Sequence, residues 1–117
     1  MTFRCRMYRV VPGKLGAFND FFLRHLLPVQ QRYGAKLVGR WASGDGAVIV
    51  ALWVYKSPEA YEVIQNQVSC DPDSATAQSY RREHLEPLFT ETEEWLMTST
   101  VPLGLTALAA LTPENRH

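Results

Sequence analysis

Arginine and aromatic side chains recur with a spacing of two near the start of the chain. Arg4, Arg6 and Tyr8 alternate with apolar residues in MTFRCRMYRV, a period that places their side chains on one face of a β-strand. A guanidinium among aromatic rings can bind a carboxylate, an enolate or a carbonyl oxygen while the rings hold an apolar body. The simpler interpretation is an arginine that stacks on tryptophan or pairs with an acid of a partner subunit. Both interpretations stay open at this point.

The histidines and cysteines of the chain suggest less chemistry. His25 falls at the edge of an apolar helical stripe, which is typical of a core or interface residue, and His84 has Glu83 and Glu86 nearby, which indicates a surface ion-pair network. The three histidines and two cysteines show no metal-ligand spacing, and the sequence has no glycine-rich phosphate loop. We therefore expect neither a metal nor a cofactor.

The elements that must position these residues follow from the apolar periodicity. Residues 3–11 alternate as a strand, which a Pro-Gly pair then ends. From residue 14 to residue 33 the apolar positions recur in steps of three and four, which predicts a helix. Pro28 lies inside this helix and predicts a kink or a looser turn near His25.

The second half of the chain repeats these patterns. Asp45-Gly46 between two apolar runs predicts a hairpin, and Ser57 followed by Pro58 is typical of a helix start. The predicted ranges are 35–42 and 47–55 for two strands, 57–68 and 75–89 for two helical pieces, and 94–101 for a last strand.

This order of elements predicts the fold class. It is α+β and corresponds to a ferredoxin-like βαββαβ arrangement, in which right-handed crossovers put the helices on one face of a four-stranded antiparallel sheet. The first and third strands then form its centre. We expect one domain at residues 1–103 and a C-terminal tail at 104–117.

The alternation also assigns the two faces of the sheet. The odd-numbered residues of the first strand and the even-numbered residues of the third strand are expected to meet the helices. For the second strand, the alternation allows either the set of Leu37, Gly39 and Trp41 or the set of Val38 and Arg40, and we favour the Trp41 set. The uncovered face then carries the candidate ligand-binding residues, which are Arg6, Tyr8, Trp41, Trp53 and Tyr55.

An uncovered face with four aromatic rings needs a partner. Such rings cover about 150–250 Å² each, so roughly 600–1,000 Å² would meet water, more than a monomer usually exposes. RNA-recognition modules share this topology, but the strand AVIVALWVY lacks their signature and the net charge is zero. We therefore expect a homodimer whose two sheets meet face to face and close into a barrel. Neither nucleic acid nor a membrane is expected as a partner.

Composition is that of an ordinary globular domain. The chain is 46% hydrophobic and 21% charged, and no apolar run approaches the ~18 residues of a membrane span. The first residues lack the apolar segment of a secretory signal, and the two cysteines suggest a reducing compartment. We expect a cytoplasmic protein.

Several stretches together resemble the NIPSNAP family of the dimeric α+β barrel superfamily. They are YRVVPGKLGAFNDFFLRHLLPVQQRYGAKLVGRW, ALWVYKSPEAYE and EWLMTSTVPL. The matching features are Arg6 and Tyr8 before PGK, HLLP with a following Tyr-Gly, a Gly-x-Trp and a Leu-Trp-x-Tyr-x-Ser strand exit, over about residues 3–103. The resemblance implies a homodimeric barrel without an assigned reaction. Ala51 stands where many members have a histidine, which argues against histidine chemistry on that strand.

These observations lead to functions of different classes. In the first, the protein binds a small apolar or aromatic molecule in an internal pocket, anchored by Arg6 and without turnover. In the second, it is a cofactor-independent enzyme, monooxygenase-like or isomerase-like, that acts on a small carbonyl or aromatic compound. Arg6 would then stabilise oxyanion charge, while Trp41 and Trp53 orient the substrate. A purely structural protein would instead fill the pocket with its own side chains.

Overall fold

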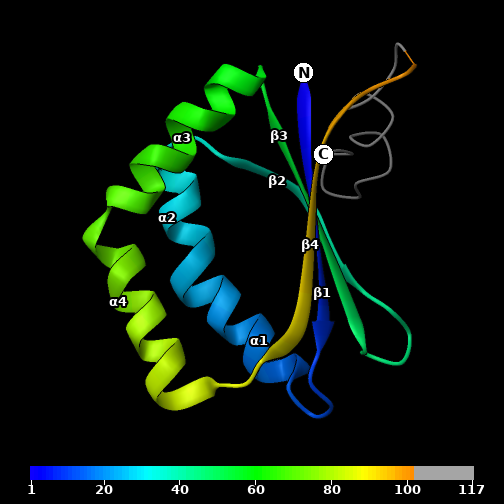
Figure 1. Cartoon of the computed structure of the whole chain (residues 1–117), viewed down its shortest axis with the longest axis vertical. Coiled ribbons are helices and arrows are strands. Elements are labelled where there is room, and N and C mark those ends of the chain that lie inside the picture. Colours follow the sequence, from blue (N-terminus) through cyan, green and yellow to red (C-terminus); the bar gives the residue numbers. More distant parts are fainter. Residues whose placement is uncertain (102–117) are drawn as a thin grey trace, which may run out of the picture.

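The computed structural model describes residues 1–101 of the 117-residue chain. Its strands form one antiparallel sheet in the order β2-β3-β1-β4, and the helices lie together on one side of that sheet (Figure 1). The predicted ferredoxin-like βαββαβ fold, with β1 and β3 at its centre, is confirmed. The strands are β1 (Thr2–Val10), β2 (Lys36–Ala42), β3 (Val48–Tyr55) and β4 (Phe89–Thr98); the helices are α1 (Leu15–Phe21), α2 (Leu27–Arg32), α3 (Pro58–Cys70) and α4 (Pro72–Tyr80), with π-helical segments η1 (Phe22–Leu26) and η2 (Arg81–Leu85).

The first helical stretch loosens where the sequence predicts it. α1 passes into the π-helical segment η1 and then into α2. Pro28, at the start of α2, has no N–H to donate to the carbonyl of Arg24, and its ring crowds that carbonyl. The wider turn of η1, which contains Arg24 and His25, accommodates this mismatch. Gly34 then follows the helix with a φ of 95°, a left-handed conformation that suits glycine.

One carboxylate joins the end of α2 to the start of α4. Asp71 caps α4 by accepting a hydrogen bond from the backbone N–H of Asp73 at 2.8 Å. Its other oxygen accepts from the Tyr33 hydroxyl at 2.6 Å and from Arg32 Nη1 at 2.5 Å. Since the Asp71 side chain is largely buried, these bonds hold the end of α2 against the start of α4.

The predicted boundaries hold except at the last helix and strand. Ser57 caps α3 through a hydrogen bond from a first-turn backbone N–H at 3.0 Å, as predicted. The last helical piece, predicted to reach residue 89, ends with η2, and β4 begins at Phe89 instead of residue 94. Pro87 is the physical reason, because the residue before a proline avoids the helical region. Glu86 is accordingly extended, with a ψ of 147°.

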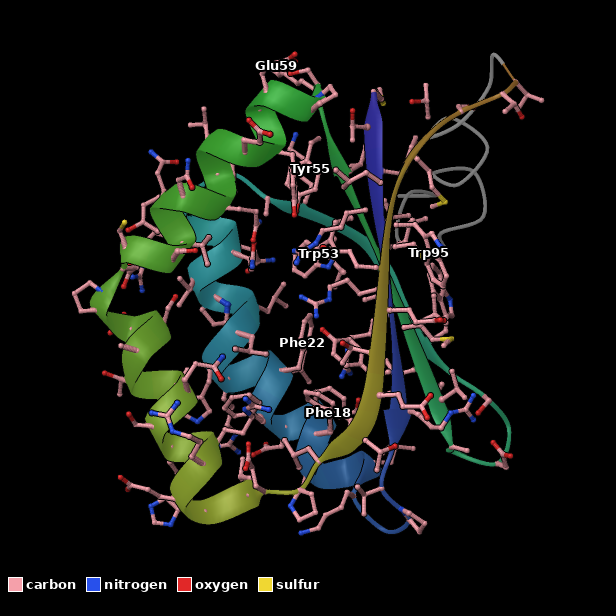
Figure 2. All side chains as sticks on the ribbon, viewed as in Figure 1. Phe18, Phe22, Trp53, Tyr55, Glu59 and Trp95 are labelled. Carbon is pink, nitrogen blue, oxygen red and sulfur yellow. The ribbon has the colours of Figure 1, made fainter. Side chains whose placement is uncertain are left out.

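The helices cover the sheet face opposite to the predicted one. Trp53 and Tyr55, expected to be uncovered, are 3% and 4% exposed. Figure 2 shows both side chains pointing toward the helices, whereas Trp95 points away on the other side of the sheet. The central strands carry apolar residues on both faces, so a period of two identifies which residues share a face but not which face is covered.

β2 contains an irregularity that the alternation could not reveal. Leu37 pairs with Trp53 and Gly39 with Leu52, so β2 advances two residues where β3 advances one. This β-bulge shifts the faces of the following residues. The expected set of Leu37, Gly39 and Trp41 is therefore split, and Arg40, set aside in the sequence analysis, pairs with Ala51 on the helix-covered face.

The sheet face away from the helices is called the open face below. On this face Val50 of β3 pairs with Trp41 on one side and with Met7 on the other. Cys5 of β1 pairs with Trp95 of β4. Trp41 is 52% exposed and Trp95 is 47% exposed. A Cβ on Gly39 would collide with the indole of Trp41, which explains why a glycine stands two residues before this tryptophan. Phe3, Val48, Leu52 and Met97 extend the open face along the strands.

No helix within residues 1–101 is long and apolar enough to cross a membrane. The predicted domain boundary at 103 and the predicted tail at 104–117 lie outside the described residues.

Candidate functional site

A cavity of about 540 Å³ lies between the sheet and the helices. The sheet contributes Arg4, Arg6, Tyr8, Ala51 and Trp53 to its wall, and the helices contribute the phenylalanines of α1 and η1 together with polar residues of α3 and α4. Aromatic walls with a few polar groups, at this volume, are typical of small-molecule sites. The described side chains therefore leave this space open, unlike the packed pocket of the third alternative in the sequence analysis.

Four residues form a register row across the sheet beside this cavity. Arg40 of β2 pairs with Ala51 of β3, Ala51 pairs with Arg6 of β1, and Arg6 pairs with Glu94 of β4. Their side chains share the helix-covered face. Adjacent strands are about 4.8 Å apart, so Arg6 and Arg40 flank the single methyl group of Ala51. Two guanidinium groups therefore stand on either side of the smallest side chain in the row.

Two other arginines of the cavity wall have carboxylate partners. Arg4 is 7% exposed and forms an ion pair with Glu94. Burial acts to lower the pKa of Arg4, but the hydrogen bond from Arg4 to Glu94 and the charge of Glu94 outweigh it and raise that pKa. Arg81 Nη1 lies 3.6 Å from Glu86 Oε1. The positive charges of Arg4 and Arg81 are thus balanced within the protein.

Arg6 and Arg40 have no such balance. Neither forms an ion pair among residues 1–101, and Arg6 Nε, Arg40 Nε and Arg40 Nη2 are buried without a hydrogen-bond partner in that range. Arg40 Nη1 donates to the side-chain oxygen of Asn19. Burial lowers the pKa of Arg40, since water no longer solvates its charge. These three donor atoms are therefore enclosed by the protein without a hydrogen bond in that range.

Aromatic rings lie close to both of these guanidinium groups. Arg40 Cζ lies 4.3 Å from the ring centroid of Phe22 and 4.9 Å from that of Phe18. Arg6 Cζ lies 5.2 Å from the ring centroid of Tyr8. Figure 2 shows Phe18, Phe22 and Trp53 directed into the space between sheet and helices. Cation–π attraction of this kind stabilises a positive charge in part, but it leaves the N–H donors unused.

Two amide side chains of the cavity wall, Gln30 and Gln65, bond to each other. Gln65 Nε2 of α3 donates to Gln30 Oε1 of α2 at 2.9 Å and to the Tyr55 hydroxyl at 3.4 Å. Burial raises the pKa of Tyr55, so its hydroxyl keeps its proton at neutral pH. The amides are uncharged, and the charged Arg4 and Glu94 lie close to Tyr55.

His25 lies in the cavity wall within a stack of rings. Its imidazole is 4.8 Å from the ring of Tyr80 and 5.5 Å from that of Phe21. His84, in η2, lies beside Tyr80 and 3.7 Å from Glu83. Of the two glutamates expected near His84, Glu83 lies beside it, whereas Glu86 pairs with Arg81. No cluster of three or more histidine, cysteine, aspartate or glutamate side chains that could hold a metal occurs in residues 1–101.

The structure brings together three of the five predicted ligand-binding residues. Arg6, Tyr8 and Trp53 line the cavity, and Tyr55 lies behind Gln65 at its edge. Trp41 lies on the open face instead. The predicted grouping was therefore wrong for Trp41, because the bulge in β2 reverses the residues that follow it. Ligand binding by the other four remains a prediction.

Sequence reasoning missed part of the site. Phe18 and Phe22 were assigned only to the core stripe of a helix, yet they line the cavity. Arg40, from the set of strand residues that was set aside, lies against the rings of Phe18 and Phe22 but does not line the cavity. A charged residue within an otherwise apolar strand, such as Arg40, could have drawn attention, because arginine is rarely buried without a partner.

Residues 3–101 match the model of the NIPSNAP family. The chain belongs to the NIPSNAP family. An uncharacterised NIPSNAP domain protein from Burkholderia xenovorans is 22% identical with a TM-score of 0.72, over 87% of this chain and 99% of that one. A NIPSNAP family protein of unknown function from Agrobacterium tumefaciens is also 22% identical with a TM-score of 0.72, over 85% and 87% of the two chains.

The same fold occurs in a described enzyme. SnoaB, a cofactor-independent oxygenase from Streptomyces nogalater, is 18% identical to this NIPSNAP protein with a TM-score of 0.61, over 88% of this chain and 96% of that one. At this identity the similarity shows the fold alone. A search of curated proteins found no match.

Proposed function

We propose that this NIPSNAP protein binds a small apolar or aromatic molecule in the cavity between its sheet and helices. The cavity itself is the observation that supports the proposal, because about 540 Å³ bounded by Phe18, Phe22 and Trp53 is large enough for a molecule of one or two rings. Arg6 and Tyr8 supply polar groups that fix the orientation of the molecule. The ligand-binding role of Tyr55 is indirect, through Gln65.

Native mass spectrometry of the purified chain tests this proposal. Ala51→Leu fills part of the cavity, since Ala51 is in its wall and 2% exposed. The wild type is expected to retain a small molecule of defined mass, and Ala51→Leu is expected to lose it. Ala42→Leu makes the same change at an exposed position of β2 and is the matched control. Equal loading of all three chains would place the bound molecule elsewhere and contradict the proposal.

The open face supports a second part of the proposal, a homodimer. It carries Trp41, Trp95 and Met97, which are 52%, 47% and 41% exposed. Contiguous apolar surface of this kind usually marks an interface. Two copies meeting through their open faces would cover it, while each cavity stays within its own protomer. The expected interior of the barrel is then formed by open-face residues rather than by Arg6 and Tyr8.

The alternative function is a cofactor-independent enzyme. The observation in its favour is the shared fold with a cofactor-independent oxygenase, together with arginines placed where oxyanion charge could develop. Dissolved-oxygen uptake with 1-naphthol as the probe distinguishes the two functions. Uptake that depends on the wild-type protein and is lost in Ala51→Leu would favour the enzyme, and no uptake despite binding of the probe would favour the binding protein.

The cytoplasmic location remains a prediction.

A further inference from the structure

The arginines that line the cavity differ in whether a carboxylate pairs with them. They are Arg4, Arg6 and Arg81. Glu94 pairs with Arg4, and Glu86 pairs with Arg81. Arg6 forms no ion pair in the part of the chain that the structure describes, although Glu94 is its register partner on β4. The arginines of the wall and their partners therefore leave one positive charge in excess, at Arg6.

The hydrogen bonds of the cavity wall identify the same location. Most of its polar side chains have protein partners: Gln30 and Gln65 bond to each other, Ser69 to the carbonyl of Gln65, Ser74 to that of Val68, and Arg81 to Gln78. Among the polar wall residues within 1–101, Arg6, Tyr8 and His25 have no side-chain hydrogen bond. His25 is held in a ring stack with Phe21 and Tyr80, whereas Arg6 and Tyr8 are neighbours on β1. The unused polar groups of the wall are therefore concentrated on that strand.

Arg6 and Tyr8 present accessible polar atoms to the cavity. They stand two residues apart on the helix-covered face of β1, and Arg6 Cζ lies 5.2 Å from the ring centroid of Tyr8. Both side chains are partly exposed. Arg6 Nε is enclosed, but the two terminal nitrogens of Arg6 and the hydroxyl of Tyr8 are neither enclosed nor hydrogen-bonded within residues 1–101. Because both residues line the cavity, a molecule inside it can reach these atoms.

We propose that the ligand of this cavity is an aromatic carboxylate, whose carboxylate group binds the terminal nitrogens of Arg6 and the hydroxyl of Tyr8. This inference rests on the proposed binding function and adds the charge of the ligand to it. A carboxylate matches the parallel N–H groups of a guanidinium and also accepts a hydrogen bond from a hydroxyl. The ring of Phe18 lies 5.1 Å from that of Tyr8, so the apolar wall begins beside the proposed anion site. The aromatic part of the ligand then packs on Phe18, Phe22 and Trp53.

Isothermal titration calorimetry with 2-naphthoate and with its neutral analogue 2-naphthamide tests the inference at pH 7.5. The two probes have the same ring system, so they differ mainly in charge. The full-length wild type is expected to bind the carboxylate at least about tenfold more tightly than the amide, which a charge-assisted bidentate contact supplies. Arg6→Gln is expected to abolish that preference while the amide still binds. Tyr8→Phe keeps the ring and is expected to weaken binding of the carboxylate at least about threefold, because one hydrogen bond is lost.

Matched variants make the result specific. Arg9→Gln removes an arginine from the same strand, but Arg9 is exposed and pairs with Glu91, so the preference is expected to stay unchanged. Tyr80→Phe removes a hydroxyl from a tyrosine that is 40% exposed and does not line the cavity, and it is expected to bind the carboxylate as the wild type does. Arg6→Lys keeps the charge without the planar fork and is expected to restore part of the preference that Arg6→Gln loses. Binding of the amide by each variant shows that its cavity is folded.

The possible results have distinct meanings. Equal or tighter binding of the amide by the wild type would overturn the anion inference and leave the proposed binding function standing. A preference that survives in Arg6→Gln would overturn the role of Arg6, and unchanged carboxylate binding in Tyr8→Phe would overturn that of Tyr8. Absence of binding by both probes would overturn the inference. If native mass spectrometry then also finds no retained molecule, the proposed function is overturned with it.

Discussion

The two arginine–glutamate pairs of β1 and β4 differ in their surroundings more than in their chemistry. Arg4 is 7% exposed beside Glu94, whereas Arg9 and Glu91 are 52% and 67% exposed, with 3.5 Å between Nε and Oε2. Removing a carboxylate from a buried arginine leaves a charge without water or a partner. Removing one from the surface leaves a charge that water solvates. The same substitution therefore has different consequences on the two faces.

This contrast gives a prediction for stability. Glu94→Gln is expected to lower the free energy of unfolding by about 1–2 kcal/mol, a value reduced because Glu94 itself is partly exposed. Glu91→Gln, the matched control, is expected to change it by less than about 0.5 kcal/mol. Urea denaturation of both variants measures the difference. Similar values for the two would mean that Arg4 is not buried as described.

The two cysteines provide a second prediction at the level of single residues. Burial raises the pKa of the Cys5 thiol, on the open face, whereas Cys70, at the end of α3, is exposed. A raised thiol pKa means less reactive thiolate at a given pH. At pH 8 iodoacetamide is expected to modify Cys70 at least about ten times faster than Cys5. Peptide mass spectrometry follows the modification of each cysteine over time. Faster modification of Cys5 would contradict the described burial.

At the scale of elements, Asp71 connects two helices, and its charge should be measurable. The Tyr33 hydroxyl, the backbone N–H of Asp73 and Arg32 hydrogen-bond to its carboxylate and lower its pKa. A folded-state pKa below the unfolded value of about 3.9 stabilises the fold above that pH, and the stabilisation is lost as the pH falls through the folded value.

The corresponding variant is Asp71→Asn. At pH 7 its melting temperature is expected to fall by roughly 5 °C or more, since a helix cap and two side-chain bonds weaken. The difference from the wild type should shrink below pH 4, where the wild-type carboxylate begins to be protonated. Asp20→Asn, which removes an exposed aspartate bonded to Arg24, is the control. A pH-independent difference would show that the charge of Asp71 is not what matters.

The elements also show what the sequence could predict and what it could not. Local chemistry located most of them, because Pro28, Ser57 and Gly34 act through their own backbone or that of the next turn. The prediction of which sheet face the helices cover was wrong. β3 is apolar on both sides, so its period of two does not distinguish the covered face from the other one. The bulge in β2 depends on pairing between strands, which no local pattern of residues 36–42 contains. Arg40 was therefore missed and Trp41 was misplaced.

At the scale of the whole molecule, the open face accounts for the proposed homodimer. Val50 lies at its centre, paired with Met7 on one side and Trp41 on the other. Burying a glutamate there in a dimer would desolvate its charge in both copies. Val63, on the outer side of α3, is 58% exposed, so the same substitution there meets only water.

Light scattering of the two variants tests the dimer. The wild type and Val63→Glu are expected to show the mass of two 13.3 kDa chains, and Val50→Glu the mass of one. Circular dichroism should show an unchanged fold for both variants, because neither residue faces the cavity. A wild-type mass of one chain, or a dimer of Val50→Glu as stable as the wild type, would contradict dimerisation through the open face.

Ligands are expected to bind beneath the helices and not on the open face, and the tryptophans report on each location. ¹⁹F NMR of 5-fluorotryptophan-labelled protein resolves Trp41, Trp53 and Trp95, assigned by single phenylalanine substitutions. Titration with 2-naphthoate is expected to shift the resonance of Trp53, which lines the cavity, and to leave those of Trp41 and Trp95 in place. Shifts of Trp41 and Trp95 with an unchanged Trp53 would contradict this expectation.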